Sequence, residues 1–404
     1  MRTMLGRCVE VTVVGVVMVL GALAPSTGRA QAPLRRLARS DAEHREPFTS
    51  ISGLRELSDG RVLVADVREK TLQLIDLSRG TSRAVGRQGA GPGEWGSVSE
   101  LVALPGDTTM MIDVANGRVF LVGPDGTPAP PVRMAENSPL LWSQLVGADA
   151  AGRLLLVKSR APSTPTAGSV GTADVMRLDR RSARVDTVAT LAEPKGELTA
   201  ARILGGGMMQ LVTNLPFASR DLAAIAPDGR IALVRSAPYR VEWIAPDGTR
   251  REGAVAASPN IPVTAAEKAD FARRSVRPGG ILIRRGPAAP PQKEGAGATP
   301  QPRTPTMSKL DVEKLFTPDQ EWPAVKPPFL DAAVRVAPDG RVWVQRTRAW
   351  DDSIPTFDVF DAAGRVVERV ALPRRTRLVG FGTKSLYLAR TDDDDLVWLQ
   401  RVPR

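Results

Sequence analysis

Short apolar runs that directly follow a turn dipeptide recur along the whole chain. Three copies share the phrase Asp-Gly-Arg before the apolar residues, at 59–64, 228–234 and 339–344. Weaker copies follow Gly106 and Gly152, and these two glycines continue at equal intervals from Gly60. A turn dipeptide before an apolar run is typical of a hairpin that enters a buried strand. The interval matches the period of a propeller blade, about 40–50 residues.

The first complete unit shows what each repeat contains. Apolar runs at 51–57, 61–65 and 72–75 are followed by a fourth that ends at Val85, with turn residues between them. Four antiparallel strands joined by tight turns make one blade of a β-propeller.

The same reading gives six blades, the last with only three strands of its own. The expected units are 51–85, 99–134, 140–191, 222–256, 332–372 and 377–400. The missing outer strand is expected from residues 33–38, because pairing the two chain ends would close the ring and remove its exposed edge. The prediction is an all-β, six-bladed β-propeller closed by its N- and C-terminal strands.

The long segments between strands all fall at one end of the predicted ring. In a four-stranded blade the first and third turns share one end, here named the turn end, which holds the Asp-Gly turns. The second turn and the link to the next blade share the other, named the insertion end. The long segments there are 87–98, 159–173, 193–220, 258–328 and 346–356. One-sided insertions predict a binding face, although they can also be merely tolerated there.

The largest insertion, 258–328, is predicted to be partly helical and partly disordered. Thr264 and Glu267 form a capping box, which predicts a helix over 264–274. A proline- and glycine-rich stretch is expected to be disordered, and a second short helix should follow, at 286–305 and 308–316.

Two motifs in the first units resemble a known family. The run 65–76 is similar to the NHL-type blade motif, and 86–95 resembles the glycine-rich linker that ends in Gly-Glu-aromatic between NHL blades. The mature chain is similar to exported bacterial six-bladed propellers of NHL-like or TolB-like type, which carry a comparable insertion ending near 322–329. The resemblance implies the fold and transfers no catalytic residue.

The N-terminal 30 residues are predicted to be a signal peptide. Arg2 and Arg7 precede an apolar stretch at 11–24, and small residues follow at 28–30. We expect a mature chain of 31–404 that is exported to the periplasm or the outside and has no transmembrane segment. Cys8 is the chain's one cysteine and lies before the apolar stretch, so the mature chain would form no disulfide.

The charge of the chain favours some partners over others. The formal net charge is +11, but the arginines are dispersed and aromatic residues make up only 4%. Nucleic-acid binding proteins concentrate positive charge with interleaved aromatics. We therefore expect no nucleic-acid partner, and either a solvated basic surface or attraction to anionic envelope polymers.

Few residues offer catalytic chemistry. His44 is the one histidine, and nothing beside it indicates a nucleophile that it could activate, so a surface position is expected. The glycines at 89–93 lead into a strand and not a helix, which favours a linker over a phosphate-binding loop.

Oxygen-bearing side chains in the second turns are the remaining candidates. Converging carboxylates could hold a divalent cation such as calcium, although Asp and Asn are also ordinary turn residues. No catalytic residue or cofactor is predicted. The candidate ligand-binding residues are Asp66, Trp95, Asp113, Asn116, Trp350 and Asp351.

Two functions from different classes remain open at this point. The first is a non-enzymatic, monomeric binding or scaffold protein that recognises a protein or envelope ligand through its long-loop face. The alternative is a calcium-type hydrolase or lactonase with carboxylates at the channel mouth.

Overall fold

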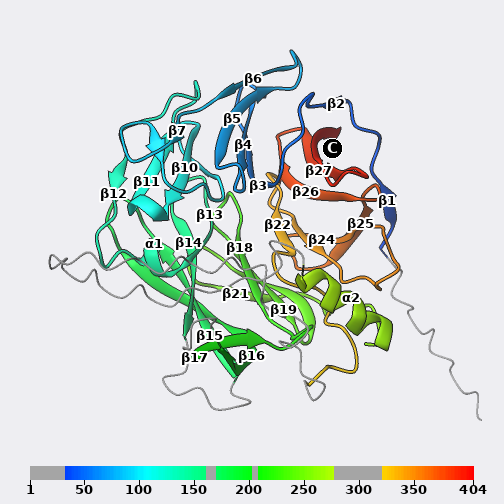
Figure 1. The fold of residues 1–404 in the computed structure, drawn as a ribbon. Coiled ribbons are helices and arrows are strands. Elements are labelled where there is room, and N and C mark those ends of the chain that lie inside the picture. Colours follow the sequence, from blue (N-terminus) through cyan, green and yellow to red (C-terminus); the bar gives the residue numbers. More distant parts are fainter. Residues whose placement is uncertain (1–31, 161–169, 203–207, 277–320) are drawn as a thin grey trace, which may run out of the picture. The chain divides into compact units, whose positions relative to one another are not determined.

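Six sheets follow one another along the chain and form the blades of a β-propeller (Figure 1). The computed structural model describes residues 32–160, 170–202, 208–276 and 321–404, and the blades belong to one unit, Pro33–Arg404. The six-bladed prediction is confirmed. The expected disorder at 286–305 and the helix at 308–316 lie outside the described residues.

Blades 1 and 2 have the predicted four-stranded order. Blade 1 contains β3 (Ile51–Glu56), β4 (Val62–Asp66), β5 (Thr71–Asp76) and β6 (Thr81–Ala84). Blade 2 contains β9 (Val102–Leu104), β10 (Thr108–Asp113), β11 (Arg118–Val122) and β12 (Val132–Arg133). The link between them has a short parallel pair, β7 (Arg87–Gln88) and β8 (Glu94–Trp95), and the 3-10 helix η1 spans Val114–Asn116.

Blade 3 is longer than expected and blade 4 is regular. Blade 3 contains β13 (Gln144–Ala148), β14 (Leu154–Arg160), β15 (Val170–Leu178), β16 (Val185–Arg202) and β17 (Met208–Asn214). The predicted start of blade 3 at residue 140 is wrong, because Ser138 caps the short helix α1 (Pro139–Trp142) and the first strand begins only at Gln144. Blade 4 contains β18 (Leu222–Ile225), β19 (Ile231–Ser236), β20 (Tyr239–Ile244) and β21 (Arg250–Glu252).

The insertion after blade 4 opens with the predicted helix, α2 (Ala265–Val276). Thr264 Oγ1 accepts a hydrogen bond from Glu267 N, as a helix cap should. Blade 5 then contains β22 (Val334–Val336), β23 (Val342–Gln345), β24 (Thr356–Phe360) and β25 (Val366–Ala371). Blade 6 contains β26 (Thr376–Phe381), β27 (Ser385–Thr391) and β28 (Val397–Pro403).

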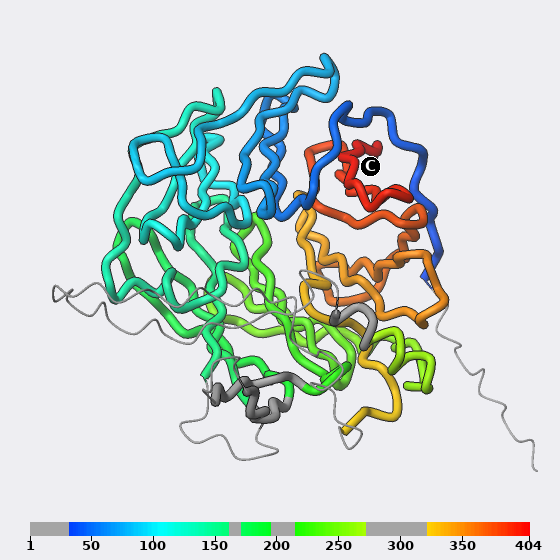
Figure 2. Tube along the Cα trace, viewed as in Figure 1, coloured from blue at the N-terminus to red at the C-terminus, as the bar shows by residue number. Residues whose placement is uncertain are grey.

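The N-terminal segment closes the ring, but not with the residues predicted. Residues 33–38 contain β1 (Leu34–Arg36), which pairs in parallel with β25 of blade 5. The outer strand of blade 6 is β2 (Ala42–Glu43), antiparallel to β28. The segment therefore edges two neighbouring blades, as Figure 2 shows along the C-terminal blades. The apolar pattern could not predict β2, because Ala42–Glu43 is too short to show an alternation of apolar and polar residues.

Each interface between neighbouring blades holds its own hydrophobic cluster. Six clusters of buried residues are present, and each draws on two successive blades, including one that joins blade 6 to blade 1. Every residue of β4 is buried: Val62 and Val64 contribute to the cluster with blade 6, and Leu63 to that with blade 2. Middle strands are buried on both faces, which explains why they read as continuous apolar runs. No helix in the described part of the chain is long and apolar enough to span a membrane.

Candidate functional site

The repeated Asp-Gly-Arg phrase neutralises its own charge at the turn end. Asp59 Oδ1 accepts a hydrogen bond from Arg61 N at 3.0 Å, and its other oxygen lies 2.6 Å from Arg61 Nε. The Asp228 turn repeats both contacts with Arg230. Gly60 has a φ of +86°, a conformation that glycine adopts without strain. The phrase is thus a turn motif whose arginine is already paired.

Asp66, the first predicted ligand-binding residue, is engaged by the backbone around it. Its carboxylate is fully buried at the end of β4 and accepts hydrogen bonds from four amides, those of Thr49, Ser50, Arg68 and Glu69. These bonds tie the entry to β3 to the second turn of the same blade.

Asp113 and Asn116 are brought together, in the same position of blade 2. Asp113 is fully buried and accepts hydrogen bonds from Gly96 N, Ser97 N, Asn116 Nδ2 at 2.7 Å and Arg118 Nε at 3.2 Å. Burial acts to raise the pKa of Asp113, but these hydrogen bonds outweigh it and lower the pKa below its ordinary value. The carboxylate is therefore held ionised as part of the loop.

Trp95 lies in the core between blades 1 and 2. Its side chain is 1% exposed, meets Phe120 edge to face at 5.3 Å between ring centroids, and donates from Nε1 to Lys70 O at 3.4 Å. Its position is set by the linker, since a Cβ on Gly86 would lie 2.2 Å from the Trp95 ring. The linker interpretation of the glycines at 89–93 agrees with this packing.

Trp350 and Asp351, in the second turn of blade 5, are exposed. Trp350 is 47% exposed, and its backbone N donates to Glu267 Oε1 of α2 at 2.9 Å. Glu267 also forms a buried ion pair with Lys326, whose Nζ donates to Arg348 O at 2.9 Å. The insertion is therefore fastened to the second turn of blade 5.

Aromatic packing reinforces this attachment. Phe271 of α2 packs edge to face on Phe217, with ring centroids 5.0 Å apart, and on Trp322 at 5.7 Å. Lys326 Nζ lies 4.7 Å from the ring centroid of Phe217. Because Phe217 lies between blades 3 and 4, α2 spans from that link to blade 5.

The sequence pattern did not single out three charged residues that face one another at the centre of the ring. Glu100 lies two residues before β9, Arg335 lies on β22 and Arg377 on β26; these are the innermost strands of blades 2, 5 and 6. Figure 1 shows β22 and β26 with the other labelled inner strands around the middle of the ring. In a ring of six, blades 2 and 5 lie opposite each other, so the charge of Arg335 acts on Glu100 across the centre.

Glu100 and Arg377 are exposed and Arg335 is partly exposed, so solvent weakens the interactions among the three charges. Desolvation raises the pKa of Glu100, and the positive charge of Arg335 opposes that rise. Desolvation lowers the pKa of Arg377, and Arg335 lowers it further, because two guanidinium groups repel each other. Among the described residues each arginine donates to backbone carbonyls: Arg377 to Ile51 O at 2.7 Å, and Arg335 to Val334 O at 3.1 Å and Ala332 O at 3.4 Å.

The sequence does contain a signal for these central charges, in the residues that flank the two arginines. Arg335 stands between two valines and Arg377 between Thr376 and Leu378, so each interrupts an inner strand that is otherwise apolar or small. An inner strand borders the central channel of a propeller, where the packing between neighbouring blades ends, so a long charged side chain on it can reach solvent. Cation chemistry at the centre could have been predicted from these two positions.

The described residues also bear on a metal site. Within residues 32–160, 170–202, 208–276 and 321–404, no three His, Cys, Asp or Glu side chains converge so as to hold a metal ion. Asp66 and Asp113 lie on separate blades, and hydrogen bonds of the protein occupy both.

No protein-family model and no curated protein sequence matches the chain. Among solved structures, virginiamycin B lyase from Staphylococcus aureus is 9% identical with a TM-score of 0.42, over 91% of this chain and 98% of that one. A member of the DUF4221 family from Bacteroides vulgatus is 7% identical with a TM-score of 0.45, over 91% and 96%. A gluconolactonase from Xanthomonas campestris is 10% identical with a TM-score of 0.43, over 91% and 99%. These values are too low to transfer an activity.

Proposed function

We propose that this chain is an exported propeller that binds an anionic group of a partner protein or an envelope polymer at its insertion end, without catalysing a reaction. The observation that carries the proposal is the pair Arg335 and Arg377 at the ring centre. Among the described residues neither guanidinium forms an ion pair, and their mutual repulsion falls when an anion binds between them.

The surface around these arginines supports a macromolecular ligand. The inner strands, β26 among them, begin at the insertion end of the ring. Several large apolar side chains are exposed at this end. They are Val67, Val114, Trp142, Leu330, Trp350 and Leu396. Tryptophans at the rim of a charged centre are typical of binding surfaces, because aromatic and arginine side chains dominate binding energies.

The N-terminal pattern supports export. Residues 1–30 have the charged, apolar and small-residue regions of a signal peptide, and residues 31–404 contain no cysteine. A net positive charge would attract the mature chain to anionic polymers outside the cytoplasm. N-terminal sequencing of the protein recovered from outside the cytoplasm tests this part, with a chain beginning at Gln31 as the expected result.

Binding is tested with two anionic probes, poly-L-glutamate and purified lipopolysaccharide. We expect saturable binding to one of them, at least tenfold weaker in the Arg335→Ala, Arg377→Ala double variant. Glu100→Gln should bind more tightly, since it removes the negative charge that faces Arg335. The matched control is Arg374→Ala, an exposed arginine three residues before Arg377.

Three results would count against the proposal: binding to neither probe, equal binding by the double variant, or weaker binding by Glu100→Gln. Melting temperatures of all variants show whether a loss reflects the charge or the fold, because Arg377 also bonds to blade 1. Among the described residues, no cluster of side chains favours the metal-dependent alternative.

A further inference from the structure

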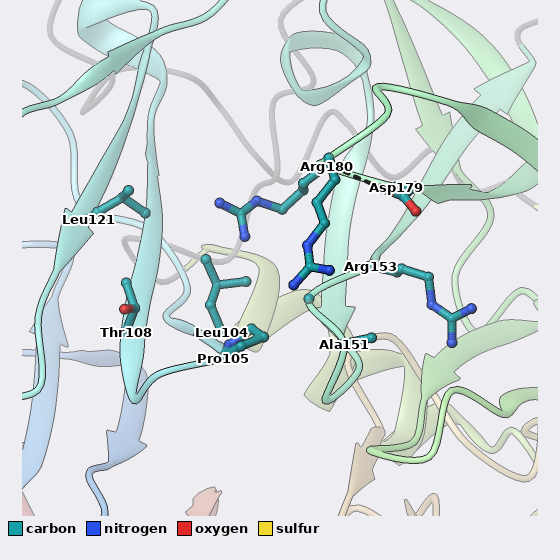
Figure 3. A pocket seen from close by; sticks show the side chains of 10 residues that line it. Leu104, Pro105, Thr108, Leu121, Ala151, Arg153, Asp179 and Arg180 are labelled. Atoms are coloured by element: carbon teal, nitrogen blue, oxygen red, sulfur yellow. Dashed lines mark hydrogen bonds between the residues drawn. The ribbon is translucent and has the colours of Figure 1, made fainter.

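A cavity of about 580 Å³ lies at the turn end, between blades 2 and 3. It is formed by the first turns of both blades and the third turn of blade 3. Its lining residues are Leu104, Pro105, Thr108, Leu121, Ala151, Gly152, Arg153, Asp179, Arg180 and Arg181. Figure 3 shows the blade 2 residues on one side and Ala151, Arg153, Asp179 and Arg180 on the other.

The third turn of blade 3 differs from the turns at Asp59 and Asp228, in which the aspartate pairs with the arginine of its own turn. Arg153 conforms to their pattern, with Nε 2.6 Å from Asp149 Oδ2. Asp179 instead uses Oδ1 to accept from the backbone N of Arg181 and Ser182, at 2.8 and 3.1 Å. These two backbone hydrogen bonds lower the pKa of Asp179, and the nearby charge of Arg181 lowers it further. Within the described residues no hydrogen bond or ion pair reaches the guanidinium of Arg180 or Arg181.

The opposite wall is mostly apolar. Leu104, Pro105 and Leu121 supply carbon surface, and Thr108 adds one hydroxyl. The two walls are held close by Gly152, where φ is +81° and a Cβ would lie 3.0 Å from Pro105 Cδ. Only a residue without a side chain brings these turns together without strain.

We propose that this cavity binds a small organic anion, with its carboxylate or phosphate on Arg180 and Arg181 and its apolar part against Leu104 and Leu121. The guanidinium groups lining the cavity outnumber its one carboxylate, Asp179. Guanidinium groups bind carboxylate and phosphate oxygens in pairs. The volume is within the usual range for small-molecule sites, about 300–1,000 Å³. The site lies at the end opposite to the proposed macromolecular surface and does not depend on it.

The test uses calorimetric titration of the full mature chain with phenyl phosphate and benzoate, which carry both a head and an apolar part. Inorganic phosphate and phenol serve as half-probes. We expect one of the two complete probes to bind at least tenfold more tightly than either half-probe, and its identity tells phosphate from carboxylate. The affinity should fall with added salt, because the attraction is ionic.

Variants locate the head group. Arg180→Ala with Arg181→Ala should weaken binding at least tenfold, whereas Arg251→Ala, an exposed arginine on β21, should leave it unchanged. The methyl resonances of Leu104 and Leu121 should shift on titration, a readout that needs no variant. Absence of saturable binding, equal affinity of the double variant, or unmoved leucine methyls would overturn the proposal.

Discussion

The two ends of the ring treat their charges differently. At the insertion end, carboxylates such as Asp66, Asp113 and Glu267 are buried and hold the loops in place. At the turn end, Asp59 and Asp228 are exposed and pair with the arginine of their own turn, and among the paired turn residues Asp149 is a buried exception. In both regions most charges serve the fold, so long loops alone do not locate a site. The two proposed sites are marked instead by arginines that form no ion pair with a described residue. These are Arg335 and Arg377 at the centre of the ring, and Arg180 and Arg181 at the turn end.

The largest effect is expected from Lys326→Ala. Removing one partner of a buried ion pair leaves the Glu267 carboxylate uncompensated, at about 3–5 kcal/mol. Since α2 belongs to none of the blades, we expect rapid proteolysis within 258–328 while the cavity at the turn end still binds its anion. Lys268→Ala is the control, because that exposed lysine only approaches the Trp322 ring, at 5.4 Å. Equal proteolysis of both variants would show that the ion pair does not fasten the insertion.

A matched pair of aspartates tests the contrast between the ends directly. Asp113→Ala should lower the free energy of unfolding by about 3 kcal/mol, because it leaves several buried hydrogen-bond donors without an acceptor. Asp59→Ala should lower it by less than about 1 kcal/mol, since that ion pair is largely solvated. Denaturant unfolding of both variants measures the difference. Equal losses would mean that the two ends use aspartate in the same way.

The smallest effect concerns pH and His44. The predicted surface position is wrong: His44 is 4% exposed, packs near Phe48 at 5.6 Å and adjoins the closing strand β2. Burial lowers its pKa, so the unfolded chain binds the proton more readily than the folded chain. Stability is therefore full above the ordinary pKa of 6.5 and is lost as the pH falls below it. His44→Phe should flatten the fall of the melting temperature between pH 7 and 5; an unchanged slope would contradict this.

The fold was predictable because its cause is local and repeated. Turn residues at Asp59, Asp228 and Asp339 with continuous apolar runs after them determine hairpins, and stacked hairpins bury both faces. What failed depends on contacts distant in sequence. The apolar runs cannot show that Leu34 joins blade 5, or that His44 becomes buried against the last strand.

The candidate site was less predictable than the fold. Asp66 and Asp113 carry the right chemistry for a ligand, but hydrogen bonds from backbone amides decide their use, and the sequence does not show those bonds. The reverse holds for Arg180 and Arg181, which look like ordinary turn residues. Whether an arginine finds a partner depends on which side chains the fold brings near it.

The double use of the N-terminal segment has a consequence for the order in which the protein is made. Glu43 accepts a hydrogen bond from Gln400, a residue 357 positions later in the chain. Synthesis therefore releases β2 long before its partner strand, and the ring stays open until β28 has emerged. Contacts of such separation form slowly. A chain truncated before β28 would leave β27 as an unpaired edge of blade 6 and β2 without its partner strand, so the ring closes only after β28 has been made.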